Sequence, residues 1–193
     1  MEGQVLIFVT GGVRSGKSSW AEHYLTVKKN QANRLVYIAT SFPSDEEMTK
    51  RILQHQLKRA QGKEKWLAIE QTNDVGKLSK KLQKNDFVLL DCLTTLLTNE
   101  LFFHEQHGER WQAASFRQYV LEKIIRDLSE LQKSCELFCI VSNEVNWEFP
   151  ARSNAVFQYV RLLGHLHQQI VERADLAVRM EFGIPVAMKG ELQ

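Results

Sequence analysis

The chain has 193 residues, a net charge of +2 and 44% hydrophobic residues. This length suits one domain, residues 1–193, with a full apolar core, and the near-neutral charge argues against a nucleic-acid partner. Every apolar run is shorter than the roughly 20 residues of a membrane span, and the first ends too early for a signal peptide. Because the three cysteines show no C-x-x-C spacing, we expect a reduced, cytoplasmic protein.

Apolar runs alternate with amphipathic segments along the chain. The predicted strands are 5–9, 35–39, 66–70, 87–91 and 137–141, and the predicted helices are 17–28, 44–61, 116–131 and 157–174. A hairpin of 176–182 and 186–189, turning at Gly183, Ile184 and Pro185, would follow. Strands separated by helices predict an α/β fold with a mainly parallel sheet. The hairpin would give it an antiparallel C-terminal edge.

The most specific motif follows the first predicted strand and opens the first predicted helix. It matches G-x-x-x-x-G-K-S with Gly11, Gly12, Val13, Arg14, Ser15, Gly16, Lys17 and Ser18. This context is the one that a phosphate-binding loop requires, because its N–H groups and the helix dipole surround a polyphosphate. We expect Lys17 to bind the outer phosphates and Ser18 to bind Mg²⁺. The alternative is a chance match on a Gly/Ser-rich turn. We favour the phosphate-binding loop, and with it a three-layer, RecA-like P-loop NTPase fold.

Two acidic residues follow later predicted strands. Asp91 ends the run 87–91, where an acid could hold Mg²⁺ next to Ser18 or could cap a helix at Thr94. Glu144 follows the run 137–141 and so falls at the carboxyl edge, where open α/β sheets bind ligands. Glu144 is a candidate substrate-facing or metal-facing acid, and the alternative is a loop cap.

Histidine is the remaining candidate for chemistry. His104 and His107, flanked by Glu105, Gln106 and Gly108, are read as part of a solvated loop, because no nearby Cys or acid completes a convincing zinc site with them. His165 and His167 lie two apart on a predicted helix and are read as surface or packing residues. From the residues alone, His55 is a surface side chain on a basic helix.

Several motifs recur together in one order, and the chain thereby resembles the bifunctional adenosylcobinamide kinase/adenosylcobinamide-phosphate guanylyltransferase family of cobalamin biosynthesis. The similarity runs from Leu6 to Lys189. It rests on the motif 11–18, on Tyr37-Ile38-Ala39-Thr40-Ser41, on Asp45, Met48, Arg51, Ile52, His55 and Arg59, on Asp91-Cys92-Leu93-Thr94 with Asn99, and on Ser142-Asn143-Glu144-Val145.

The resemblance implies roles for particular residues. His55 would be the catalytic residue that is guanylylated, with Lys17 as the second catalytic residue. Further nucleotide contacts are implied at Thr40, Ser41, Phe42, Gln56, Leu57, Lys58, Arg59, Glu70 and Asp91. It also implies Mg²⁺, GTP or ATP as substrates, adenosylcobinamide and its phosphate as acceptors, and a homotrimer.

The implied chemistry has two parts. The loop, Lys17 and Mg²⁺ would support phosphoryl transfer by positioning and charge neutralisation. A neutral His55 imidazole can attack the α-phosphorus of GTP and expel pyrophosphate, and the substrate phosphate then takes the guanylyl group. Two rival functions remain: a small-molecule kinase without a covalent intermediate, and a nucleotide-gated regulatory protein.

The chain departs from the family pattern in three places. A longer segment, 60–65, follows Arg59, and the bulky Trp147 and Phe149 stand where glycines are usual. Past Tyr159, an Arg-Asp pair and a later Asn are replaced by Val160, Arg161 and His167. These departures bear on the corrinoid site or a subunit interface more than on nucleotide binding.

Overall fold

The computed structural model describes residues 4–41, 64–102, 109–145 and 153–192. The predicted helix 44–61 lies outside these ranges, as do Phe42, Trp147, Phe149 and the segment His55 to Arg59. The described elements, in chain order, are β1 (Val5–Gly11), α1 (Lys17–Lys28), β2 (Arg34–Ala39), β3 (Trp66–Glu70), η1 (Val75–Lys81), β4 (Asp86–Asp91), α3 (Leu93–Phe102), η2 (Arg110–Gln112), α4 (Ala114–Lys133), β5 (Leu137–Val141), α5 (Asn154–Arg173), β6 (Leu176–Glu181) and β7 (Ile184–Lys189).

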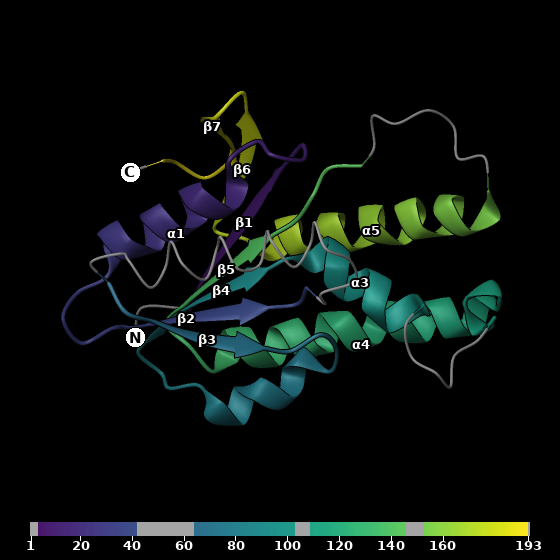
Figure 1. Ribbon diagram of the computed structural model, residues 1–193, viewed down its shortest axis with the longest axis horizontal. Helices are drawn as coiled ribbons and strands as arrows, with labels where there is room; N and C mark the ends of the chain where they lie inside the picture. The colour runs from purple at the N-terminus through teal and green to yellow at the C-terminus, as the bar shows by residue number, and fades with distance from the viewer. Residues whose placement is uncertain (1–3, 42–63, 103–108, 146–152, 193) are drawn as a thin grey trace.

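The strands form one seven-stranded sheet in the order β3-β2-β4-β5-β1-β6-β7 (Figure 1). All neighbours are parallel except β6 and β7, which confirms the predicted mainly parallel sheet with its antiparallel edge. Parallel strands place all their carboxyl ends at one edge. That edge carries the residues that follow β1, β2, β4 and β5, including the phosphate loop, residues 11–18.

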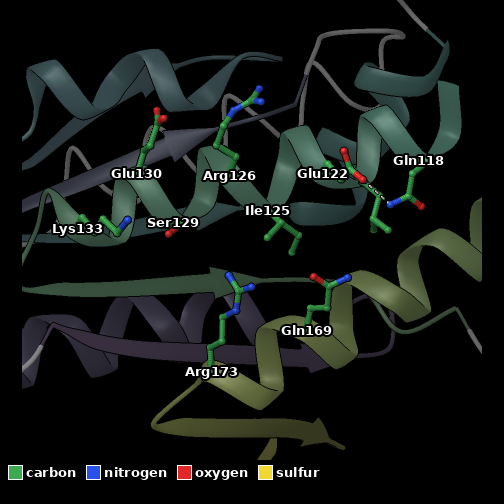
Figure 2. Close-up of a pocket in the computed structure, with 10 residues that line it drawn as sticks. Gln118, Glu122, Ile125, Arg126, Ser129, Glu130, Lys133, Gln169 and Arg173 are labelled. Atoms are coloured by element: carbon green, nitrogen blue, oxygen red, sulfur yellow. Dashed lines mark hydrogen bonds between the residues drawn. The ribbon is translucent and has the colours of Figure 1, made fainter. Parts of the chain in front are cut away.

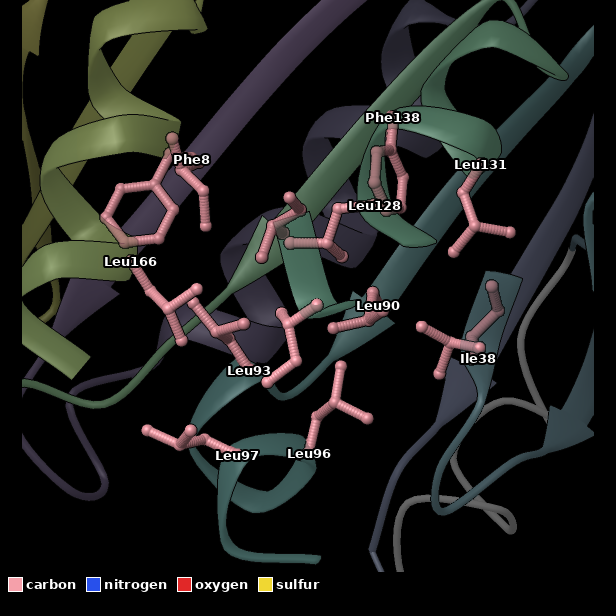
Figure 3. Close-up of a cluster of buried hydrophobic side chains, with 14 of the residues drawn as sticks. Phe8, Ile38, Leu90, Leu93, Leu96, Leu97, Leu128, Leu131, Phe138 and Leu166 are labelled. Carbon is pink, nitrogen blue, oxygen red and sulfur yellow. The ribbon is translucent and has the colours of Figure 1, made fainter. Parts of the chain in front are cut away.

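Helices cover both faces of the sheet, so each face has its own apolar core. Ala21 and Leu25 of α1 pack with Ile7, Val9 and other side chains on one face. The opposite face packs against α3, α4 and α5, where Phe8, Leu90 and Phe138 of the sheet meet leucines of these helices (Figure 3). This three-layer arrangement explains the continuous apolar strands, since both faces are buried.

The helix α3 was not among the predicted helices, and the sequence indicated its start only through the alternative that Asp91 caps a helix at Thr94. Its sequence Leu-Thr-Thr-Leu-Leu-Thr-Asn-Glu-Leu-Phe has seven buried residues out of ten. A helix buried on most sides lacks the clear polar face on which periodicity depends. Its first residue, Leu93, follows Asp91 closely, so α3 leaves the sheet from the carboxyl edge.

The C-terminal hairpin turns earlier than predicted. The turn is formed by Phe182 and Gly183, because Glu181 pairs with Ile184 across it. The predicted turn residues Ile184 and Pro185 therefore belong to β7. Pro185 is accommodated because β7 is an edge strand, which needs no N–H donor on its outer side.

A charged cluster joins η1, α3 and α4. The Lys123 ammonium lies 2.7 Å from Asp74 and 3.6 Å from Asp127, and it also contacts Glu100. Hydrogen bonds from Lys123 and Lys77 lower the pKa of Asp74 to about 2. The three carboxylates share one region, but the ammonium of Lys123 is the cation that they surround.

Candidate nucleotide-binding site

The phosphate loop has the backbone conformation that its glycines allow. Gly16 caps α1 in the left-handed region, with φ of 90°. At Gly11, a Cβ atom would lie 2.6 Å from the carbonyl oxygen of Met180, so only glycine allows β6 to approach this closely. The loop thus bends tightly between β1 and α1 and lies against β6.

Lys17 is the first residue of α1, and it is 6% exposed. Its Nζ donates a hydrogen bond of 2.6 Å to the carbonyl oxygen of Gly12. The ammonium therefore lies within the loop, at the positive end of the α1 dipole. Two sources of positive potential coincide there, which suits an anionic polyphosphate.

Asp91 ends β4 on the same face of the sheet as α1. Phe87 and Leu89, at alternate positions before it, belong to the core that α1 covers. The hydroxyl of Tyr37 donates a 2.7 Å hydrogen bond to Asp91 Oδ2, and Tyr37 is part of the same core. The sequence did not reveal this partner, because Tyr37 entered only as a residue of a predicted strand and of the motif 37–41.

The chemistry of Ser18 and Asp91 fits Mg²⁺. Ser18 is the second residue of α1, and both residues offer oxygen ligands, which this ion prefers. Both also lie at the carboxyl edge, on the α1 side of the sheet. The alternative was that Asp91 caps a helix. Its hydrogen bond to the Tyr37 hydroxyl gives no support to that role.

Asn143 and Glu144 follow β5 at the same edge. The Glu144 N–H donates to the carbonyl oxygen of Gly11 at 3.0 Å, which places this residue directly beside the phosphate loop. Asn143 Nδ2 donates to Thr94 Oγ1 at 2.9 Å. The structure thus brings Glu144 to the loop, whereas Asn143 ties β5 to α3.

The predicted contacts after β2 and β3 lie farther along the sheet. The buried hydroxyl of Thr40 donates to the carbonyl oxygen of Cys92, and the Cys92 N–H donates to that hydroxyl, both at 2.8 Å. Ser41 follows and is partly exposed. Glu70 ends the edge strand β3, four strand spacings or about 19 Å from β1. A nucleotide contact at Glu70 is therefore separate from the phosphate loop.

His167 has a partner that the sequence did not reveal. Its Nε2 lies 2.8 Å from Ser142 Oγ, and its ring packs edge-on against Phe8 with centroids 5.0 Å apart. Burial lowers its pKa to about 4, so the ring is neutral near pH 7. The prediction of a packing residue holds for His167, and His165 is exposed on α5 as a surface residue.

A groove of about 470 Å³ lies between α4 and α5 (Figure 2). Ile125, Gln169 and Arg173 line it, and a smaller hollow beneath it reaches Leu6 and Phe138 near the starts of their strands. The groove therefore opens toward the amino half of the sheet, away from the phosphate loop. It is separate from the nucleotide-binding edge.

The described helices include none long and apolar enough to cross a membrane. A strand, a glycine loop with an inward lysine, a helix and a strand-end acid together define a P-loop nucleotide-binding protein. In fold the chain is similar to a solved ATPase domain, with a TM-score of 0.51 and 14% identity, covering 91% of this chain and 69% of that one.

Residues 7–188 match the family described as cobinamide kinase / cobinamide phosphate guanyltransferase. The chain is 30% identical to the bifunctional adenosylcobalamin biosynthesis protein CobU of Escherichia coli K12 over 188 residues, 96% of this chain and 100% of that protein. It is 32% identical to the protein CobP of the same description from Pseudomonas aeruginosa, over 95% and 96% of the two chains. The chain therefore belongs to this family of enzymes.

Proposed function

We propose that the chain phosphorylates adenosylcobinamide with ATP or GTP and then converts the product to adenosylcobinamide-GDP with a second nucleotide, GTP. The observation that carries this proposal is the phosphate loop with Lys17 folded into it, in a chain that matches the family over residues 7–188. The loop provides nucleotide binding, and the family match provides the substrate class and the second reaction.

In the kinase step, the aminopropanol hydroxyl of the substrate attacks the γ-phosphorus. The bond from this phosphorus to its bridging oxygen breaks, and the nucleoside diphosphate leaves. Lys17 and the loop N–H groups hold the phosphates and offset their negative charge. Glu144, beside Gly11, is the proposed acceptor of the hydroxyl proton. Mg²⁺ held by Ser18 and Asp91 would neutralise further phosphate charge.

In the transferase step, a ring nitrogen of His55 attacks the α-phosphorus of GTP and pyrophosphate leaves. A phosphate oxygen of the first product then attacks the same phosphorus, the N–P bond breaks, and His55 is regenerated. One difficult displacement thus becomes two easier ones. We assign the further nucleotide contacts to Thr40, Ser41, Phe42, residues 56–59 and Glu70. His55 lies outside the described residues, so this assignment rests on the sequence resemblance.

The two activities can be separated by product analysis. The purified enzyme is incubated with adenosylcobinamide, Mg²⁺ and either ATP alone or GTP, and the corrinoids are resolved by mass spectrometry. ATP alone should give the phosphate, and GTP should give both the phosphate and the GDP derivative. The phosphate without any GDP derivative would favour a plain small-molecule kinase, and no corrinoid product at all would favour a nucleotide-gated regulator.

The assembly and location are also proposals. The family resemblance supports a homotrimer, which sedimentation equilibrium would test by a mass of three chains. The three cysteines are free and buried, which agrees with a reducing, cytoplasmic setting.

A further inference from the structure

The turn between β6 and β7 carries a phenylalanine in an unfavourable position. Phe182 is 101% exposed, and its φ of 50° lies in the left-handed region. Gly183 follows with φ of 82°. Two successive positive φ angles define a turn type in which Asn-Gly or Asp-Gly is strongly preferred. A bulky aromatic residue there is a conformational outlier, and its ring lies in water.

This turn lies beside the phosphate loop. In the sheet Gly11 pairs with Met180, two residues before Phe182, and the two strands touch closely at this point. The β6–β7 hairpin stands at the same end of the sheet as the start of α1 (Figure 1). Phe182 therefore extends from the carboxyl edge next to the strand that leads into the loop.

The junction between the loop and β6 also contains unsatisfied polar atoms. Among the described residues, the buried side-chain atoms without a hydrogen-bond partner are Thr10 Oγ1, Ser15 Oγ and Arg179 Nε. Thr10 pairs with Arg179 across β1 and β6, and Ser15 Oγ points at Gly11. Thr10 and Arg179 alternate with Val9 and Val178, so they face the side of the sheet away from α1. Buried polar groups are normally satisfied, and Ser15 Oγ, which belongs to the phosphate loop itself, therefore suits a ligand held in that loop.

The polar groups of the site indicate which end of the nucleotide lies at the turn. Asp91 and Glu144 follow β4 and β5, on one side of β1 in the strand order, whereas β6 and β7 lie on the other. The reacting phosphate belongs among the acids. The nucleoside, at the opposite end of the triphosphate, then extends toward the β6–β7 side.

We propose that Phe182 is a stacking platform for the purine base of the nucleotide held by the phosphate loop. The inference rests on the proposed function, since it requires a nucleotide in that loop. Next to the turn, Arg179 Nη2 pairs with Glu181 Oε1 at 2.6 Å, and β7 completes the hairpin. Aromatic stacking is tolerant of base identity, so Phe182 serves ATP and GTP alike.

The test compares the affinities of two ligands, one that carries a purine base and one that consists of phosphates alone. Titration calorimetry in Mg²⁺ measures binding of inorganic tripolyphosphate and of the α,β-methylene analogue of GTP, which cannot release pyrophosphate. Phe182→Ala should weaken binding of the analogue about tenfold, as expected for one lost base–aromatic stack, and leave tripolyphosphate binding unchanged. Phe182→Tyr should retain the wild-type affinity. Phe157→Ala, at a half-exposed phenylalanine on α5, is the matched control.

A further variant separates function from folding. Phe182→Asn places the preferred Asn-Gly pair in the turn, so it should raise the melting temperature while weakening binding of the GTP analogue. A merely structural Phe182 would not show these opposite changes.

Several results would overturn the inference. One is equal affinity of wild type and Phe182→Ala for the GTP analogue, and another is an equal loss for both ligands. A change in sedimentation mass, or in the KM for the corrinoid alone, would assign Phe182 to a subunit contact or to the acceptor. If the wild type bound neither ligand, the proposed nucleotide site itself would fail.

Discussion

The Nζ of Lys17 donates a 2.6 Å hydrogen bond to the carbonyl oxygen of Gly12, so this ammonium is held inside the loop whose ligand it is proposed to bind. Lys17→Met keeps the length of the side chain and removes its charge. Because hydrogen bonds to charged groups contribute about 1.5–3 kcal/mol, the Kd for the α,β-methylene GTP analogue should rise at least about tenfold. Calorimetry measures this Kd. The control is Lys28→Met, at an exposed lysine at the far end of α1. Unchanged affinity would contradict the role of Lys17.

The hydrogen bond from Tyr37 to Asp91 should affect the metal requirement. It holds one carboxylate oxygen at 2.7 Å, so Tyr37→Phe would leave Asp91 less well oriented for Mg²⁺. We expect the Mg²⁺ concentration for half-maximal kinase rate to rise several-fold. Tyr24→Phe, in a tyrosine that stacks on Trp20, should leave the Mg²⁺ dependence unchanged. Equal Mg²⁺ curves for Tyr37→Phe and wild type would remove Asp91 from the proposed metal site.

Lys123 should be important for stability and unimportant for chemistry. Burial lowers its pKa, but hydrogen bonds with Asp74 and Glu100 outweigh this effect and raise the pKa overall. Lys123→Met would leave Asp74, Glu100 and Asp127 without their shared cation. Removing one partner of a buried ion pair costs about 3–5 kcal/mol, which urea unfolding would detect. Lys77→Met removes an exposed partner of Asp74 and should change stability little; equal losses for the two variants would contradict this account.

The burial of His167 should make stability depend on pH. Burial lowers the pKa of His167 from 6.5 to about 4, so the unfolded chain binds more protons between these values. The stability from the neutral ring is complete above pH 6.5 and is lost as the pH falls toward 4. At about 1.4 kcal/mol per pKa unit, the loss is at most about 3.5 kcal/mol.

His167→Asn removes this titration and keeps a polar group near Ser142. The difference in free energy of unfolding between wild type and variant, measured by urea denaturation from pH 7 to pH 4, should therefore shift in favour of the variant at the acid end. A difference that stays constant over this range would show that His167 does not titrate as described.

The sequence predicted most of the sheet, because long apolar runs such as 137–141 have few alternatives to a buried strand. It located α1 from the phosphate-loop motif. It gave no bounds for α3, in which Thr94, Asn99 and Glu100 are buried together with the leucines. It displaced the hairpin turn because Pro185 is a frequent turn residue that here occupies an edge strand.

The sequence placed the site residues at one edge of the sheet, both within the motif 11–18 and, for Asp91 and Glu144, from their positions at the ends of predicted strands. Lys17 and Ser18 belong to one motif, so it was predictable that they lie close together in space. The pairing of Tyr37 with Asp91, or of His167 with Ser142, depends on strand order and on how a helix packs. The same limitation concerns Glu70: its place in the family pattern did not show that four strand spacings separate it from β1.

The guanylyl-histidine is the central claim, and covalent labelling tests it most directly. The enzyme is incubated in Mg²⁺ with GTP labelled at the α-phosphate, then denatured and treated with acid. The wild type should keep α-label after denaturation, lose it in acid, and carry no label from γ-labelled GTP. The control variant His165→Ala, at an exposed histidine on α5, should behave in the same way. His55→Ala should carry none. No α-label on a wild-type enzyme that binds GTP, or undiminished α-label on His55→Ala, would contradict the account.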